Sequence, residues 1–227
     1  MSGHLKAYLA EFIGTFALVF AAAAAACAAG LTPGSVSPLG PSLAYGSAYA
    51  VMAYAYGTVS GGQFNPALTL SLLLMRRIDV IKGVFYLVSQ LLGAALAGQL
   101  LIAALHRHPE VASPPFLGSV GLTGVGFKAA TLLEAVMTFF LVTAYYATAI
   151  DNRAKRGTTP LACGLALFAG VLVLGPLTGG ALNPARAFGP SIVTGNWAAW
   201  YVYWAGPLAG ALGAALLYEK LFLDAKK

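Results

Sequence analysis

Two asparagines are the residues of this sequence best suited to act on a small polar molecule. Asn65 and Asn183 begin two copies of one tripeptide, Asn65-Pro66-Ala67 and Asn183-Pro184-Ala185, which lie 118 positions apart (183 minus 65). Asn is a favoured helix N-cap residue and Pro is favoured at the first helical position. The Asn side-chain amide also carries two N–H donors. Each copy therefore predicts a helix start with a hydrogen-bond donor beside it.

A glycine pair precedes each copy of this motif. The first copy follows Gly61-Gly62-Gln63-Phe64, and the second follows Gly179-Gly180-Ala181-Leu182. Glycine readily adopts left-handed backbone conformations, so we expect both stretches to be non-helical. Carbonyls outside a helix have no helical partner and can accept hydrogen bonds from polar solutes. The two stretches are therefore predicted to line a path for polar molecules.

The composition places most of the chain in a lipid bilayer. Of its 227 residues, 59% are hydrophobic and 9% are charged, whereas a soluble domain has about 25% charged residues. The net charge of +6 does not indicate nucleic-acid binding, because membrane topology explains most of the Lys and Arg. Cys27 and Cys163 lie in apolar segments, so no disulfide framework is expected. The sequence presents no pattern of catalytic nucleophile, paired acids or metal ligands, so neither an enzyme nor a cofactor is expected.

Six segments are long and apolar enough to cross a membrane, since a spanning helix needs about 20 residues. They are Leu5–Ala29, Ser42–Val59, Val80–Leu105, Lys128–Ile150, Thr159–Pro176 and Trp197–Phe222. Two shorter runs, Asn65–Met75 and Asn183–Thr194, begin at the repeated motif, and the first is stopped by Arg76-Arg77. The first would extend about 16 Å as a helix, half of a ~30 Å hydrocarbon core, so it can enter the membrane but not cross it. The segment His106–Phe127 is expected to be a polar loop that contains Pro and Gly. The expected fold is an all-α membrane protein with six transmembrane helices and two re-entrant half-helices.

The chain, residues 1–227, is predicted to be one domain made of two similar halves, residues 1–115 and 125–222. Ala10-Glu11-Phe12 matches Leu133-Glu134-Ala135, and Gln90-Leu91-Leu92-Gly93 parallels Pro207-Leu208-Ala209-Gly210. Each half has three spans, an odd number, so the halves must be inverted relative to each other.

The distribution of positive charge predicts the orientation. With the N-terminus inside, ten of the 13 Lys and Arg residues fall on the inner side. The positive-inside rule therefore predicts that both termini are cytoplasmic. The short tails and loops favour a prokaryotic inner membrane.

Inversion would bring the starts of the two half-helices together near the midplane. Non-helical backbone at that depth is tolerated only inside protein or along a water-filled cavity. Two positive helix ends and two Asn amides would repel a cation, interrupt a chain of protons and accommodate a water oxygen. The sequence therefore predicts a narrow pore.

Glu11 and Glu134 lie within predicted spans at matching places in the two halves. An ionisable residue in a membrane helix usually faces the protein interior. We interpret both carboxylates as acceptors for N–H groups of the nearby non-helical stretches, with proton relay as the alternative.

The doubled Asn-Pro-Ala motif between membrane spans resembles the signature of the aquaporin and glycerol-facilitator (major intrinsic protein) superfamily, and the resemblance covers nearly the whole chain. In that superfamily a second constriction lies outward of the two Asn residues. The resemblance places this filter at Tyr45, Val171, Gly180 and Arg186. It also implies the scaffold role for Glu11 and Glu134, and a homotetramer.

The filter departs from both main patterns of the superfamily. Strict water channels usually have His where this chain has Val171, and often Cys or Thr where it has Gly180. Glycerol facilitators have Trp and Phe in the filter and usually an Asp where this chain has Ala187. Tyr203-Trp204 resembles the water-channel side. Val and Gly remove volume and one hydrogen-bonding side chain, so a wider and more apolar opening than in a strict water filter is expected. The mixture resembles plant vacuolar channels and some prokaryotic ones, several of which pass small neutral solutes as well as water.

Three functions remain open at this stage. The first is a passive water channel that also admits ammonia, hydrogen peroxide, urea or glycerol and excludes protons and ions. The second is a facilitator of glycerol or a neutral metalloid acid. The third is a structural membrane protein with a poorly conducting pore, which Asn65, Asn183 and Arg186 argue against. The expected partners are water, small neutral solutes and the lipid bilayer.

Overall fold

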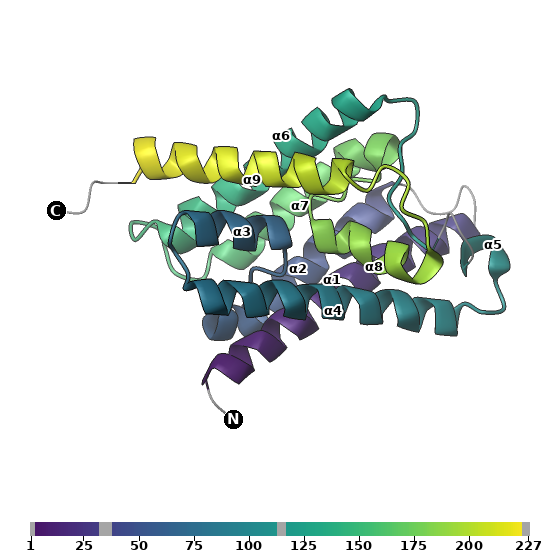
Figure 1. Cartoon of the computed structure of the whole chain (residues 1–227), viewed down its shortest axis with the longest axis horizontal. Helices are drawn as coiled ribbons and strands as arrows, with labels where there is room; N and C mark the ends of the chain where they lie inside the picture. The colour runs from purple at the N-terminus through teal and green to yellow at the C-terminus, as the bar shows by residue number, and fades with distance from the viewer. Residues whose placement is uncertain (1–2, 32–37, 113–116, 224–227) are drawn as a thin grey trace.

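The computed structural model describes residues 3–31, 38–112 and 117–223, and every element assigned in them is helical (Figure 1). Six helices are long: α1 (Gly3–Leu31), α2 (Leu39–Ser60), α4 (Val80–Ala104), α6 (Phe127–Tyr145), α7 (Thr159–Thr178) and α9 (Val202–Leu221). Two are half as long, α3 (Pro66–Leu74) and α8 (Pro184–Thr194). The remaining elements are α5 (Pro109–Ala112) and a π-helical turn, η1 (Tyr146–Ile150), at the end of α6. The arrangement of six long and two half-length helices is the predicted fold.

The two half-helices lie within the bundle, roughly in line with each other (Figure 1). α3 contacts α4 and α9, while α8 contacts α1, α4 and α9. The start of α1 and the end of α9 lie at one end of the molecule, called here the terminal end, and α5 lies at the opposite end, called the α5 end (Figure 1). α3 runs from the centre towards the terminal end, and α8 runs from the centre towards the α5 end.

The six long helices differ in their hydropathy. In the described part of the chain, four are long and apolar enough to cross a membrane by themselves: α1, α4, α6 with η1, and α7. α2 and α9 have the length but not the apolar content, because α2 contains several tyrosines and α9 ends in Glu219 and Lys220. Tyr45 and Tyr49 of α2 are buried inside the bundle, so these polar groups do not face lipid.

Two predictions were wrong in part: the start of the sixth span and the absence of a helix between the third and fourth spans. The sixth span was expected to begin at Trp197, but α9 begins at Val202 after a turn. Ala199 has a positive φ of 54°, which a right-handed helix does not allow. The segment 106–127 was expected to be a loop, but it contains α5, which begins at Pro109. Proline suits the first position of a helix because its missing N–H would have no partner there.

Glycines allow the long helices to pack closely. α1 packs on α4, α6 on α9 and α2 on α7. A Cβ atom on Gly164 would lie 2.7 Å from the carbonyl oxygen of Gly46, so α2 and α7 touch through their backbones there. Gly93 meets the backbone of Phe12 and Gly210 meets that of Ala135 in the same way. Small residues are the usual means of close helix contact in membranes.

One ion pair and one hydrogen bond hold the end of α9 at the terminal end. Arg77 donates to Glu219 at 2.5 Å through both Nε and Nη2. Arg153 donates to Asp151 and to the carbonyl oxygen of Phe222. The hydrogen bonds from Arg153 hold the pKa of Asp151 well below its usual range. The loop before α4 and the loop before α7 are thereby attached to the end of α9.

Candidate functional site

Each Asn of the repeated motif caps the half-helix that follows it. Asn65 is extended (φ −151°), and its Oδ1 accepts from the backbone N–H of Ala67 at 2.9 Å. Asn183 has nearly the same backbone (φ −156°), and its Oδ1 accepts from Ala185 at 2.9 Å. Pro66 and Pro184 occupy the first helical positions. These are the local structures that Asn-Pro favours.

The amide nitrogens of the same two residues join the halves. Nδ2 of Asn65 donates to the carbonyl oxygen of Leu182 at 2.9 Å, and Nδ2 of Asn183 donates to that of Phe64 at 2.9 Å. Both side chains are buried. Since each amide nitrogen has two hydrogens, one N–H per Asn remains for a further acceptor. The N-termini of the two half-helices therefore meet, with two donors and two positive helix ends at one place.

The two stretches before the motif, called here the pore loops, have the same unusual backbone. Gly61, Gly62, Gly179 and Gly180 all have positive φ, which is why glycine is required. Phe64 and Leu182 also have positive φ, at 50° and 52°, which is strained for large side chains. Their side chains fill notches at Gly14 of α1 and Gly170 of α7, respectively. Packing thus fixes a conformation that neither residue would adopt alone.

Glu11 binds the first pore loop from α1. Its carboxylate accepts from Ser60 Oγ at 2.6 Å, Gln63 N at 3.0 Å, Phe64 N at 2.7 Å and Gln90 Nε2 at 2.7 Å. The side chain is fully buried. All four donors use the two carboxylate oxygens, which supports the scaffold interpretation over proton relay.

Glu134 binds the second pore loop from α6 in the same way. It accepts from Thr178 Oγ1 at 2.7 Å, Ala181 N at 3.0 Å and Leu182 N at 2.7 Å. It is also fully buried. Each carboxylate accepts from two consecutive N–H groups of its loop. The loop carbonyls are therefore not needed as acceptors for these N–H groups.

Tyrosines hold several of these carbonyls, and sequence reasoning missed most of them. Tyr145 donates to Gly61 O at 2.9 Å, and Tyr49 donates to Gly62 O at 2.8 Å. Tyr45, which was predicted for the filter, donates to Ala181 O at 3.0 Å. Tyr49 follows Tyr45 by one helical turn, so the shared face of α2 was a signal that could have found it. Because a carbonyl has two lone pairs, each can still accept from a solute.

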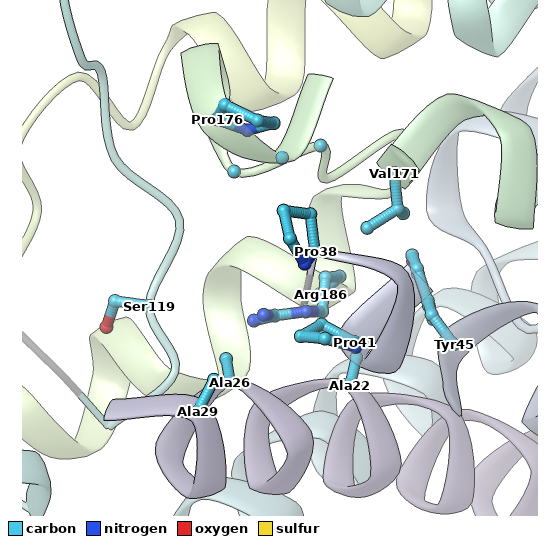
Figure 2. Close-up of a pocket in the computed structure, with 13 residues that line it drawn as sticks. Ala22, Ala26, Ala29, Pro38, Pro41, Tyr45, Ser119, Val171, Pro176 and Arg186 are labelled. Atoms are coloured by element: carbon cyan, nitrogen blue, oxygen red, sulfur yellow. The ribbon is translucent and has the colours of Figure 1, made fainter. Parts of the chain in front are cut away.

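The four predicted filter residues line one cavity at the α5 end, with a volume of about 390 Å³ (Figure 2). Figure 2 shows Arg186 near its centre, with Tyr45 and Val171 to one side. A Cβ atom on Gly180 would lie 2.9 Å from Cα of Val171, so these two residues abut. The rest of the lining is largely alanine and proline. The cavity wall is therefore apolar except at Tyr45, Ser119 and Arg186.

Arg186 is buried and held from one side. Its Nη2 donates to the carbonyl oxygen of Gly118 at 2.6 Å, whereas Nη1 has no partner among the described residues. Gly118 has a positive φ of 62° and lies against the backbone of Ala23, so no other residue fits there. Sequence reasoning missed Gly118, because the segment before α6 showed only a Gly- and Pro-containing loop. Nη1 is itself buried, so Arg186 lines the cavity with hydrogen-bond donors that the described residues do not satisfy.

A second cavity lies at the terminal end, also with a volume of about 390 Å³. It is lined by Gly61 of the first pore loop, Tyr145, Thr148 and Arg156, among others. The first cavity is lined by Gly179 and Gly180 of the second pore loop. Each loop thus opens to one cavity, and the two Asn residues lie between them. In the part of the chain that the structure describes, no group of three or more His, Cys, Asp or Glu could hold a metal ion.

Six long helices around two inward half-helices, with polar groups between two cavities, define a membrane channel. The family model of the major intrinsic proteins matches residues 1–218. Aquaporin TIP4-4 of Zea mays is 43% identical over 98% of this chain and 88% of its own length, and Aquaporin-4 of Mus musculus is 35% identical over 96% and 67%. In fold, the aquaglyceroporin from Plasmodium falciparum is similar over 96% of both chains, with a TM-score of 0.86 at 23% identity.

The chain belongs to the major intrinsic protein family. Its general function is that of a water channel in a membrane, as the aquaporins among its relatives indicate. Members of this family are channels rather than enzymes. The division at residues 115 and 125, the homotetramer and the roles of the individual site residues stay predictions.

Proposed function

We propose that this protein conducts water passively and also admits small neutral solutes such as ammonia, hydrogen peroxide, urea or glycerol, while excluding protons and ions. The observation that carries the proposal is the cavity lined by the four filter residues, called here the filter cavity. Val171 and Gly180 form one wall without a polar side chain, and the Arg186 side chain lines the same cavity. The wall leaves room that a His side chain would fill.

The centre of the pore is proposed to select against charge. The free N–H groups of Asn65 and Asn183 donate to the oxygen of a passing molecule. A water molecule there accepts two hydrogen bonds and directs its hydrogens away from the centre, which interrupts a chain of proton-transferring waters. The positive ends of α3 and α8 and the Arg186 guanidinium repel cations.

A glycerol or neutral metalloid facilitator is the second candidate, and the width of the filter favours it. Against it, Ala187 follows Arg186 where glycerol facilitators usually have Asp, and Ala187 is buried beside Tyr203 in a small apolar cluster. A poorly conducting structural protein is the third candidate. The Asn pair and the buried Arg186 argue against it, and normal water flux in liposomes would exclude it.

The proposal is tested by stopped-flow light scattering on proteoliposomes. An impermeant osmolyte drives water, and glycerol and urea gradients are applied separately. Val171→His should reduce glycerol and urea flux by at least about tenfold, and water flux by much less, because added volume in a tight site discriminates by size. Val171→Leu separates volume from polarity. Val173→Leu is the matched control, because Val173 lies on the outer face of the same helix and is 56% exposed.

The outcomes separate the candidates. Fast water flux with little solute flux in the unmodified protein would reject the wide filter and leave a strict water channel. Fast glycerol flux with slow water flux would favour the facilitator. Equal loss of all fluxes in Val171→His would mean that Val171 is not a filter position.

Orientation and assembly are also proposed. We infer that the terminal end faces the cytoplasm, from the distribution of Lys and Arg, that the protein lies in a cell membrane, and that it forms a homotetramer with lipid around it. The α5 end would then face outside. Labelling of single cysteines introduced at Lys220 and Arg107 with an impermeant reagent would test the orientation, since only the outer residue should react in sealed cells.

A further inference from the structure

The starts of α1 and α4 meet at the terminal end in a cluster of aromatic residues beside a lysine. We propose that this cluster binds the headgroup of an anionic phospholipid, with Lys82 contacting the lipid phosphate. The site is distinct from the pore and from both cavities.

The cluster consists of three aromatic rings in contact and a lysine over one of them. Tyr8 of α1 stacks on Phe85 of α4, with ring centroids 5.0 Å apart and an interplanar angle of 21°. Tyr8 also meets Tyr86 edge-on, at 6.0 Å and 86°. Nζ of Lys82 lies 5.3 Å from the centroid of the Tyr86 ring. A cation–π contact holds an ammonium in place without neutralising it, so the N–H groups of Lys82 remain available to an anion.

The charge at this place is not balanced by the protein. Among the described residues the ion pairs are Arg77–Glu219, His108–Glu110 and Arg153–Asp151, so Lys82 has no acidic partner there. The acidic residue nearest to it in sequence is Asp79. Its Oδ1 already accepts from the backbone N–H groups of Ile81 and Lys82 at the start of α4. Lys6 of α1 and Arg76 add two exposed positive charges close to the same helix starts.

The surroundings indicate a lipid rather than a free anion. Beyond the cluster, towards the middle of the two helices, the outer faces are apolar and exposed: Leu9 is 44% exposed, Val88 48% and Leu92 58%. Tyrosine and lysine above an apolar face are typical of the membrane–water boundary, and anionic lipids attract such lysines. A phospholipid can bind Lys82 through its phosphate and cover the apolar side chains with its acyl chains, whereas inorganic phosphate gains only the first contact.

The site is connected to the first pore loop. The Tyr86 hydroxyl, on the ring below Lys82, donates to Ser60 O at 2.7 Å, and Ser60 Oγ donates to Glu11 at 2.6 Å. The second half repeats the first of these bonds, because Tyr203 donates to Thr178 O at 2.9 Å. However, Ala199 precedes Tyr203 by four positions, where the first half has Lys82. The second half therefore lacks the charge, and the site is expected at the terminal end only.

The test measures lipid binding directly and does not depend on transport. Purified protein in a neutral detergent is titrated with phosphatidylglycerol or phosphatidylcholine, and bound lipid is counted by native mass spectrometry. Lys82→Gln should weaken phosphatidylglycerol binding about fivefold, the effect of one basic residue at an anionic surface, and leave phosphatidylcholine binding unchanged. Lys82→Arg should retain it. Lys220→Gln is the matched control, because it removes one exposed positive charge from the terminal end outside the cluster.

Two results would overturn the proposal. If Lys82→Gln and Lys220→Gln weaken binding equally, the attraction is diffuse charge and not a site. If inorganic phosphate displaces phosphatidylglycerol from the unmodified protein at equal concentration, the cluster binds a free anion. The competition with inorganic phosphate uses the unmodified protein, so a folding defect of Lys82→Gln would not prevent a decision.

Discussion

Glu11 in the first half and Glu134 in the second occupy equivalent positions, yet their surroundings differ. Both accept a hydroxyl and two backbone N–H groups from a pore loop. Glu11 alone accepts a fourth hydrogen bond, from Gln90, because the corresponding residue of the second half is Pro207. The bonds that shape the loop backbone are therefore repeated, and the side chains behind them are not.

The difference extends through a polar chain behind the first loop. Gln90 donates to Thr69 Oγ1, and Thr69 donates to Gln63 Oε1. The second half has Pro207, Ala187 and Ala181 at these three places. Its half-helix instead carries Arg186 where the first has Leu68. One half thus satisfies its polar groups internally, and the other presents a polar group to the filter cavity. An inverted repeat fixes a common backbone while leaving each face of the pore free to differ.

The largest expected effect is a difference between two identical substitutions. Glu134→Gln should lower the free energy of unfolding by about 4 kcal/mol, because its NH₂ would face Leu182 N and leave buried donors without acceptors. Glu11→Gln should cost about 2 kcal/mol, because the new NH₂ can donate to Gln90 Oε1, which has no partner among the described residues. Unfolding by SDS titration measures both. Equal losses would show that Gln90 does not adapt.

A smaller effect should follow from removing the additional donor itself. Gln90→Leu should cost about 1.5 kcal/mol, since Glu11 loses one of four hydrogen bonds. Combined with Glu11→Gln, it should cost more than the sum of the single changes, because the amide introduced at position 11 would lose its acceptor. A double-mutant cycle by the same titration checks this, with Thr69→Val as the control for a general loss of polarity. An additive result would contradict the proposed contact.

The smallest expected effect concerns a tyrosine hydrogen bond that the two halves share. Tyr86→Phe and Tyr203→Phe each remove one hydroxyl that donates to the residue before a glycine pair. Each should cost about 1 kcal/mol, seen as matching small decreases in the melting temperature followed by circular dichroism in detergent. A clearly larger loss for Tyr86→Phe would mean that the aromatic cluster of α1 and α4 depends on this hydroxyl, and that the halves differ in their shared bonds too.

The sequence contained enough information for the architecture. A short apolar run stopped by Arg76-Arg77 predicted a half-helix, and Asn-Pro predicted both caps, because these features act over a few residues. The filter positions came from family resemblance, and the structure brings all four to one cavity.

The rest depends on contacts between distant segments. The donation of each Asn amide to the opposite loop requires the three-dimensional meeting of the halves, which no local pattern encodes. Tyr49 and Tyr145 look like packed aromatics in apolar helices. The start of α9 was placed too early because the positive φ of Ala199 has no signature in an apolar, aromatic segment.

The hydrogen bonds from the two Asn amides to the opposite pore loops also constrain the order in which the pore is assembled. They join residues 117 and 119 positions apart in the chain, so neither can form before the second half has been synthesised. Until then the first loop keeps its attachment to Glu11 but lacks both of its bonds to the second loop. The centre of the pore is therefore completed late, after most of the helices that surround it are already in the membrane. A nascent chain that stops after its first half would carry an intact carboxylate anchor and no passage.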